Sequence, residues 1–104
     1  MYVLHDLYGR NIRLTGKRQQ HIFTDHPEMT GQIKKLEETL KRPDAIMRSN
    51  SDSSVQLFYK NYLKTPVTNK FLCVVVKMKG SDAFVITSYF TESIKKGEVL
   101  WTKK

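Results

Sequence analysis

The sequence predicts an α+β fold in which N-terminal helices pack on one face of an antiparallel β-sheet. The first half of the chain contains two helix-like segments, each bounded by a capping residue and a proline, and the second of them has apolar residues at helical spacing. The second half contains strand-like segments separated by polar turns. With 104 residues, the chain can bury one hydrophobic core and is too short for two, so we expect a single domain over residues 1–104.

The chain is expected to begin with a hairpin that leads into the first helix. Residues 2–4 and 11–14 are short strand-like runs on either side of a glycine-containing turn. Thr15 is a suitable N-cap for a helix over residues 17–25. Pro27 disfavours helical geometry at the residue before it, so the helix should end there.

A second helix has clearer boundaries. Thr30 is the expected N-cap, and Ile33, Leu36 and Leu40 recur at helical spacing. Pro43 ends this helix. The intervening positions are mostly charged, which predicts a solvated face opposite the apolar one.

Four strands should follow, over residues 44–49, 55–62, 70–78 and 83–90, with a loop at residues 65–69 and a tight turn at residues 79–82. Residues 70–78 are apolar on both faces, which predicts a central strand paired with the strands before and after it. Residues 95–101 can add an edge strand whose Trp101 packs on the body of the domain.

The chain has a large excess of positive charge, with 18 Lys and Arg residues against 10 Asp and Glu residues and a net charge of +8. Such an excess attracts polyanions and supplies phosphate contacts, so we expect RNA as a partner. No apolar run is long enough to span a bilayer, and the basic residues are not gathered on one amphipathic helix. We therefore expect no membrane association.

Cysteine usage and the start of the chain favour a cytoplasmic location. No signal peptide opens the sequence, and Cys73 has no second cysteine with which to form an internal disulfide. Cys73 lies in an apolar run, so we expect a small buried side chain rather than a nucleophile.

Two histidines form the first group that can carry chemistry. His21 falls on the first predicted helix and His26 at its exit, with Arg18 one turn before His21. Histidine is the side chain best suited to transfer protons near neutral pH, although His26 can also act as a cation at a helix C-terminus. The spacing is not that of a helical zinc pair and no thiolate lies nearby, so we expect no metal and no cofactor.

The last long strand supplies the second group. Alternation predicts that one set of its side chains covers the core and that the other lies on the opposite face. The expected core set is Phe84, Ile86, Ser88 and Phe90, and the other set is Val85, Thr87, Tyr89 and Thr91. Tyr59 and Lys60 add a phenol and a cation on a neighbouring strand. Hydroxyls, aromatic rings and cations together suit single-stranded RNA, although an ordinary solvated sheet face has a similar composition.

Six blocks occur in one order, at residues 21–29, 43–46, 57–60, 74–77, 86–91 and 94–97: HIFTDHPEM, PDAI, LFYK, VVVK, ITSYFT and IKKG. Together they resemble the phage-associated barnase/EndoU/colicin/RelE-like nuclease domains, over residues 18–101. The resemblance implies N-terminal helices packed on a twisted antiparallel sheet whose open face binds RNA. It also implies a metal-independent endonuclease, often a toxin or a domain of a phage-linked protein.

The function expected on these grounds is RNA cleavage by attack of a ribose 2′-hydroxyl on the adjacent phosphate. The resemblance implies a catalytic set of His21 or His26, Lys60, Thr87 and Tyr89. From their residue types and positions, we expect Arg18, Tyr59 and Thr91 to bind the substrate. One alternative is a domain that binds RNA or DNA without cleaving it. The other is a toxin-like protein that acts through a protein partner, in which the basic face contacts an antitoxin, an immunity protein or the ribosome.

Overall fold

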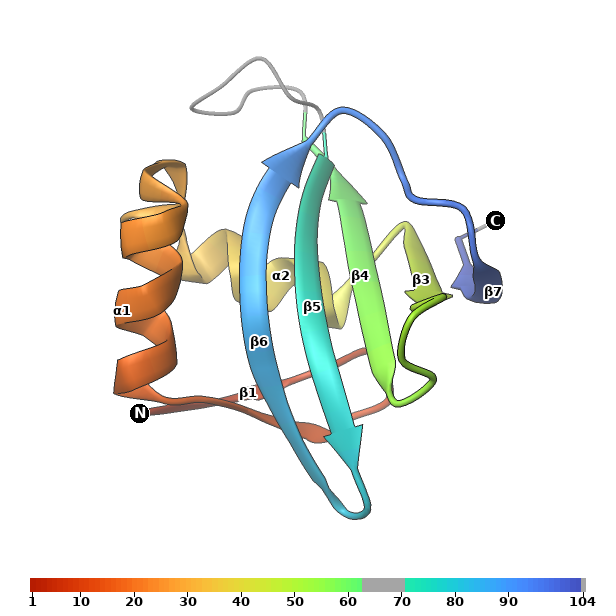
Figure 1. Ribbon diagram of the computed structural model, residues 1–104, viewed down its shortest axis with the longest axis horizontal. Helices are drawn as coiled ribbons and strands as arrows, with labels where there is room; N and C mark the ends of the chain where they lie inside the picture. The colour runs from red at the N-terminus through yellow and green to blue at the C-terminus, as the bar shows by residue number, and fades with distance from the viewer. Residues whose placement is uncertain (63–70, 104) are drawn as a thin grey trace.

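Seven strands and two α-helices form the fold in the computed structural model, which describes residues 1–62 and 71–103 (Figure 1). The strands are β1 (Tyr2–His5), β2 (Asn11–Leu14), β3 (Ala45–Arg48), β4 (Val55–Asn61), β5 (Phe71–Lys79), β6 (Asp82–Thr91) and β7 (Glu98–Thr102). The helices are α1 (Gly16–Asp25) and α2 (Ile33–Lys41), separated by the 3₁₀ turn η1 (Pro27–Met29). The predicted loop at residues 65–69 and the first residue of the predicted central strand lie outside the described residues.

The strands form one sheet in the order β1-β2-β6-β5-β4-β3-β7. β5 pairs antiparallel with both β4 and β6, which confirms the predicted central strand. The sheet is mixed, however, because β2 lies parallel to β6 through the pair Arg13 and Phe84. The expectation of a purely antiparallel sheet is wrong at this point: no local turn joins β2 to β6, so tertiary packing decides their relative direction.

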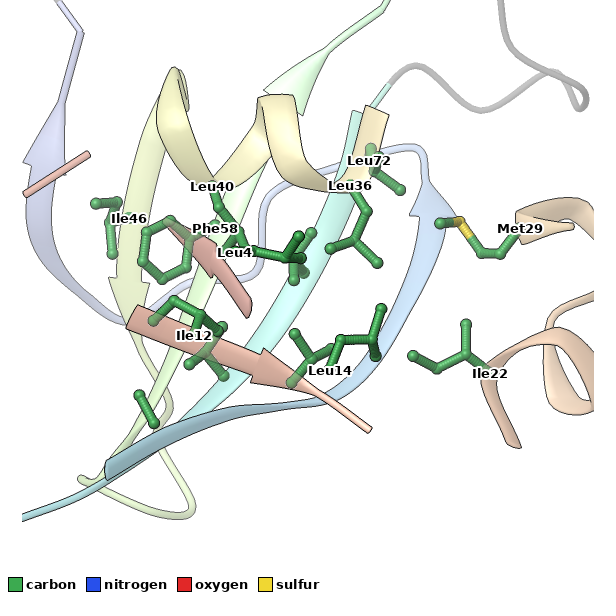
Figure 2. Close-up of a cluster of buried hydrophobic side chains, with 14 of the residues drawn as sticks. Leu4, Ile12, Leu14, Ile22, Met29, Leu36, Leu40, Ile46, Phe58 and Leu72 are labelled. Carbon is green, nitrogen blue, oxygen red and sulfur yellow. The ribbon is translucent and has the colours of Figure 1, made fainter. Parts of the chain in front are cut away.

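Both helices and the N-terminal hairpin cover one face of the central strands. Figure 1 shows α2 behind β4 and β5, and α1 beside β6. The main core lies between these elements, as Figure 2 shows for Leu4, Ile12, Leu14, Ile22, Met29, Leu36, Leu40, Ile46, Phe58 and Leu72. Trp101 of the edge strand β7 packs against this core, as predicted. No helix in the described part of the chain is long and apolar enough to cross a membrane.

The two helices differ in how well their N-termini were predicted. Thr15 caps α1 as expected, because its Oγ1 accepts a hydrogen bond of 3.1 Å from the backbone N–H of Arg18. Thr30 does not cap α2, whose N-cap position is held by Gln32. The turn η1 and the left-handed conformation of Gly31, at φ +78°, delay the start of the helix.

A β-bulge divides β6 and corrects the predicted faces. Val75 of β5 pairs with Thr87, but Val76 pairs with Val85, so Ile86 is the extra residue on β6. Val85 therefore points into the main core, together with Ser88 and Phe90 beyond the bulge. The prediction that Val85 shares a face with Thr87 and Tyr89 is wrong, because a bulge shifts side-chain alternation by one residue.

Asp6 organises the turn of the N-terminal hairpin. Its carboxylate is fully buried, accepts backbone hydrogen bonds from Tyr8 and Arg10 at 3.0 and 2.9 Å, and forms an ion pair of 2.6 Å with the Arg10 guanidinium. The guanidinium in turn donates to the Gln56 side chain at 3.3 Å, which ties the hairpin to β4.

We predict that Asp6→Ala lowers the free energy of unfolding by about 3 kcal/mol, because it leaves two backbone donors without an acceptor and the Arg10 guanidinium without its carboxylate partner. Urea unfolding at neutral pH measures the change. Asp25→Ala removes an exposed carboxylate of α1 and should cost less than about 0.5 kcal/mol. Equal losses in the two variants would show that the Asp6 network does not hold the hairpin.

Candidate active site

The sheet face opposite the helices carries a second, smaller apolar cluster. Its buried members are Met47, Leu57, Tyr59 and Cys73, and Phe71, Val75, Tyr89 and Ile94 pack against them. We call this side of β4, β5 and β6 the open face; Figure 1 looks onto it. Tyr59, Cys73 and Tyr89 lie side by side in register across the three strands, and we call these three residues the strip.

His26 lies against the open face at its β6 side. It is the residue that ends α1, because Pro27 forces it out of helical geometry to φ −133° and ψ 77°. Its imidazole ring lies 5.4 Å from the Tyr89 ring, centroid to centroid, at an angle of 41°. The imidazole is 33% exposed, so it contacts both the protein and the solvent. A helix end and a distant strand thus bring a proton-transfer side chain and a phenol together.

Glu28 places a carboxylate close to this imidazole. One of its carboxylate oxygens lies 3.8 Å from His26 Nδ1, and η1 holds the two residues in one turn. When the imidazole is protonated, the carboxylate forms an ion pair with it. The imidazole therefore has a carboxylate partner on its Nδ1 side.

The two tyrosines of the strip are protonated at neutral pH. Burial raises the pKa of Tyr89 well above its usual value, and the neighbouring Cys73 raises it further. Burial likewise raises the pKa of Tyr59 to about 12. Tyr89 is half-buried and can donate a hydrogen bond, whereas Tyr59 is 0% exposed and its hydroxyl accepts from the backbone N–H of Lys95 at 3.3 Å. Tyr59, expected to bind substrate, thus offers no surface to a ligand.

Cys73 occupies the centre of the strip. It is buried, and burial raises the pKa of its thiol to about 11. The thiol therefore stays protonated at neutral pH, and a thiol is a weak nucleophile. This agrees with the prediction that Cys73 is a small buried side chain rather than a reactive group.

Thr87 and Thr91 lie along β6 on either side of Tyr89. Both are half-buried, and their register partners on β5, Val75 and Phe71, belong to the open-face cluster. Thr91 Oγ1 donates to the Ser93 carbonyl at 3.3 Å. The hydroxyls thus lie on the same face as Tyr89, as predicted.

Lys60 does not join this group. It pairs with Leu72, a residue of the main core, so it lies on the helix side of the sheet. Its ammonium donates to the Arg42 carbonyl at 3.0 Å, at the C-terminal end of α2, where the helix dipole favours a cation. Neighbouring residues of a strand point to opposite faces, so Tyr59 and Lys60 cannot both face a common substrate.

His21 and Arg18 remain on α1. His21 is exposed, next to Ile22, which points into the core. Arg18 is half-buried in the first turn. Within residues 1–62 and 71–103, no hydrogen bond, ion pair or ring contact joins either side chain to β6. Of the two candidate histidines, His26 is the one in contact with the predicted sheet residues.

Glu28 and Lys95 were not among the site residues predicted from the sequence. Glu28 lies two residues after His26, within the block at residues 21–29 that resembles the nuclease domains. Lys95 lies in the connection between β6 and β7. It was expected to begin the edge strand, but β7 begins at Glu98, and the backbone at Lys95 contacts Tyr59 on the open face. The Asn50 side chain holds it in place by donating to the Lys96 carbonyl at 2.9 Å.

No protein-family model matches the chain, and neither a curated protein nor a solved structure matches it. The resemblance to the phage-associated nuclease domains therefore stays a prediction. Within the described residues, no three His, Cys, Asp or Glu side chains gather where they could hold a metal ion.

We predict that the Cys73 thiol makes folding stability fall with rising pH. Its pKa is raised from 9.0 to about 11 in the folded state, so its contribution is complete below pH 9 and is lost as the pH rises toward 11. The loss should amount to roughly 2 kcal/mol. Urea unfolding at several pH values measures it, with Cys73→Ala as the control that lacks this part of the slope. Identical slopes in both proteins would contradict the buried, protonated thiol.

Proposed function

We propose that the protein is a metal-independent RNA endonuclease whose reaction centre is His26 beside Tyr89. The observation that carries this proposal is the contact of the two rings on the open face. A partly exposed histidine at the edge of an apolar strip can exchange protons with a bound ribose. The phenol beside it, held neutral by burial, can donate a hydrogen bond to a phosphoryl oxygen.

The proposed reaction needs one proton-transfer group and several donors. Neutral His26 takes the proton of the ribose 2′-hydroxyl, and the 2′-oxygen attacks the adjacent phosphorus. The bond from phosphorus to the 5′-oxygen breaks, and the imidazolium gives its proton to that leaving oxygen. The products are a 2′,3′-cyclic phosphate and a free 5′-hydroxyl. Glu28 stabilises the imidazolium between the two transfers.

The remaining open-face groups position the phosphate. Tyr89 and Thr87 supply hydroxyl donors, which stabilise charge on the phosphoryl oxygens where water is partly excluded. Lys95, rather than Lys60, supplies the cation at this face. Its backbone N–H donates to the Tyr59 hydroxyl, which places it beside the strip. Burial raises the pKa of the Cys73 thiol, and the charge of Lys95 acts in the opposite direction. The excess of basic residues in the whole chain attracts RNA to this face.

A second candidate function is RNA binding without cleavage. The position of Lys60 favours it, because the cation expected to neutralise the reacting phosphate faces the other side of the sheet. In this role the open face would bind the strand through the same hydroxyls and rings. His26 would then contribute contact rather than proton transfer.

We predict that His26→Ala lowers cleavage of total RNA by at least about a hundredfold, the usual contribution of a proton-transfer group. RNA affinity, measured by fluorescence anisotropy, should change little, because such a group acts mainly in the transition state. His21→Ala is the matched control and should cleave like the wild type, since His21 is exposed on α1.

The assay is run in EDTA with end-group analysis of the products. Cyclic or 3′-phosphate ends formed in EDTA agree with the proposal. If the wild type forms no product, RNA binding without cleavage is the better account. If His26→Ala cleaves as fast as His21→Ala, the proton-transfer role is wrong.

A further inference from the structure

A further aromatic side chain, Phe84, lies on the open face near the start of β6. Phe84 precedes the bulge, and its neighbours Ala83 and Val85 both point into the main core, so its own ring lies on the opposite side. It is half-buried and belongs to neither apolar cluster of the described residues. Sequence alternation had placed it in the core. The structure instead leaves a large ring at the surface, outside both apolar clusters.

Two cations flank this ring. Arg13 on β2 and Lys77 on β5 are the register partners of Phe84 on either side. The Arg13 guanidinium carbon lies 5.8 Å from the centroid of the ring. A row of a guanidinium, an aromatic ring and an ammonium thus crosses β2, β6 and β5.

The guanidinium is fixed before any ligand arrives. Asp82 accepts two hydrogen bonds from Arg13, 2.9 Å from Nε and 2.7 Å from Nη2. The Lys77 ammonium is likewise bound, 2.7 Å from an Asp52 carboxylate oxygen. Both cations are therefore already paired, which makes them poor partners for a further phosphate. The row does, however, present two planar groups, the Phe84 ring and the rigidly held Arg13 guanidinium. Unpaired bases stack on both types of side chain.

The row and the reaction centre lie on one strand and one face. Phe84 and Tyr89 are five residues apart on β6, with one of the intervening residues in the bulge. At about 3.3 Å per residue, this separates them by about 15 Å, within reach of one short oligonucleotide. The hydroxyl of Thr87 lies between them on the same face.

We propose that Phe84 and Arg13 form a base-stacking subsite for a single-stranded RNA whose reacting phosphate lies at His26. The inference rests on the proposed function for the identity of the ligand. A base within a duplex has both of its faces covered by its neighbours, whereas an unpaired base can present a face to the ring. The subsite therefore makes the open face select single-stranded over double-stranded RNA.

The test measures the affinity of a labelled single-stranded RNA of about eight nucleotides by fluorescence anisotropy. The same sequence in duplex form is measured in parallel. All proteins carry His26→Ala, so that the RNA is not cut. Phe84→Leu removes the ring but keeps apolar bulk, and Phe84→Tyr keeps the ring. We expect Phe84→Leu to weaken single-strand binding about tenfold, the loss of one stacked base. Phe84→Tyr should bind like the parent, and duplex affinity should not change.

Tyr8→Leu is the matched control. Tyr8 is another exposed aromatic residue stacked with an arginine, since the Arg10 guanidinium lies 5.0 Å from its ring centroid. It is located in the turn between β1 and β2 and is not part of the row of Arg13, Phe84 and Lys77, so its loss should leave RNA affinity unchanged. Should Phe84→Leu not fold, Arg13→Lys keeps the charge, removes the planar guanidinium and should also weaken single-strand binding.

The results for Phe84→Leu test the stacking subsite separately from the cleavage proposal. Unchanged affinity in Phe84→Leu, or equal loss for single strand and duplex, overturns the subsite even if the wild type cleaves RNA through His26. Selective loss of single-strand binding supports the subsite even if the wild type forms no product, in which case only the cleavage proposal fails. No binding of single-stranded RNA by the parent contradicts both.

Discussion

β5 is buried on both faces, and this burial determines where the other strands and the helices lie. Leu72, Val74 and Val76 point into the core beneath the helices, while Cys73 and Val75 belong to the cluster on the other face. Such a strand must lie inside a sheet, so β4 and β6 flank it. The helices and the N-terminal hairpin cover one of its faces. Side chains of the sheet itself, together with Ile94 from the connection to β7, must close the other.

The side chains that cover this face of β5 are also those of the candidate site. Tyr59 and Tyr89 lie on either side of Cys73, and their burial keeps both phenols protonated. His26 reaches the edge of this strip because Pro27 ends α1 beside β6. The same packing that stabilises the open face therefore places a neutral hydrogen-bond donor next to a histidine. Low local polarity strengthens any hydrogen bond that a ligand makes there.

The helices and strands could be predicted from neighbouring residues in the sequence. The predicted positions of side chains were wrong where contacts between distant parts of the chain determine them. The Thr15 cap, the proline-terminated helices and the doubly apolar β5 are read from neighbouring residues, so they could be predicted. The bulge at Ile86 has no glycine or proline to mark it, and it reversed the faces of the residues before it. The parallel pairing of β2 with β6 depends on how the hairpin packs against the core. The position of Lys60, by contrast, could have been predicted. Phe58 is a core residue, and strict alternation along β4 places Lys60 on the same, helix-covered side of the sheet.

The most direct test of the account is to map RNA contacts on the folded protein by ¹H–¹⁵N chemical-shift changes, using a single-stranded RNA whose 2′-hydroxyls are methylated so that it is not cut. If the open face is the site, the largest changes fall on Thr87, Tyr89 and Lys95. A hollow beside α2 is rich in cations, including Lys34, Lys35, Lys41 and Arg42, and is the competing place for RNA to bind. Changes confined to α2, with β6 unaffected, would contradict the central claim that the open face binds RNA.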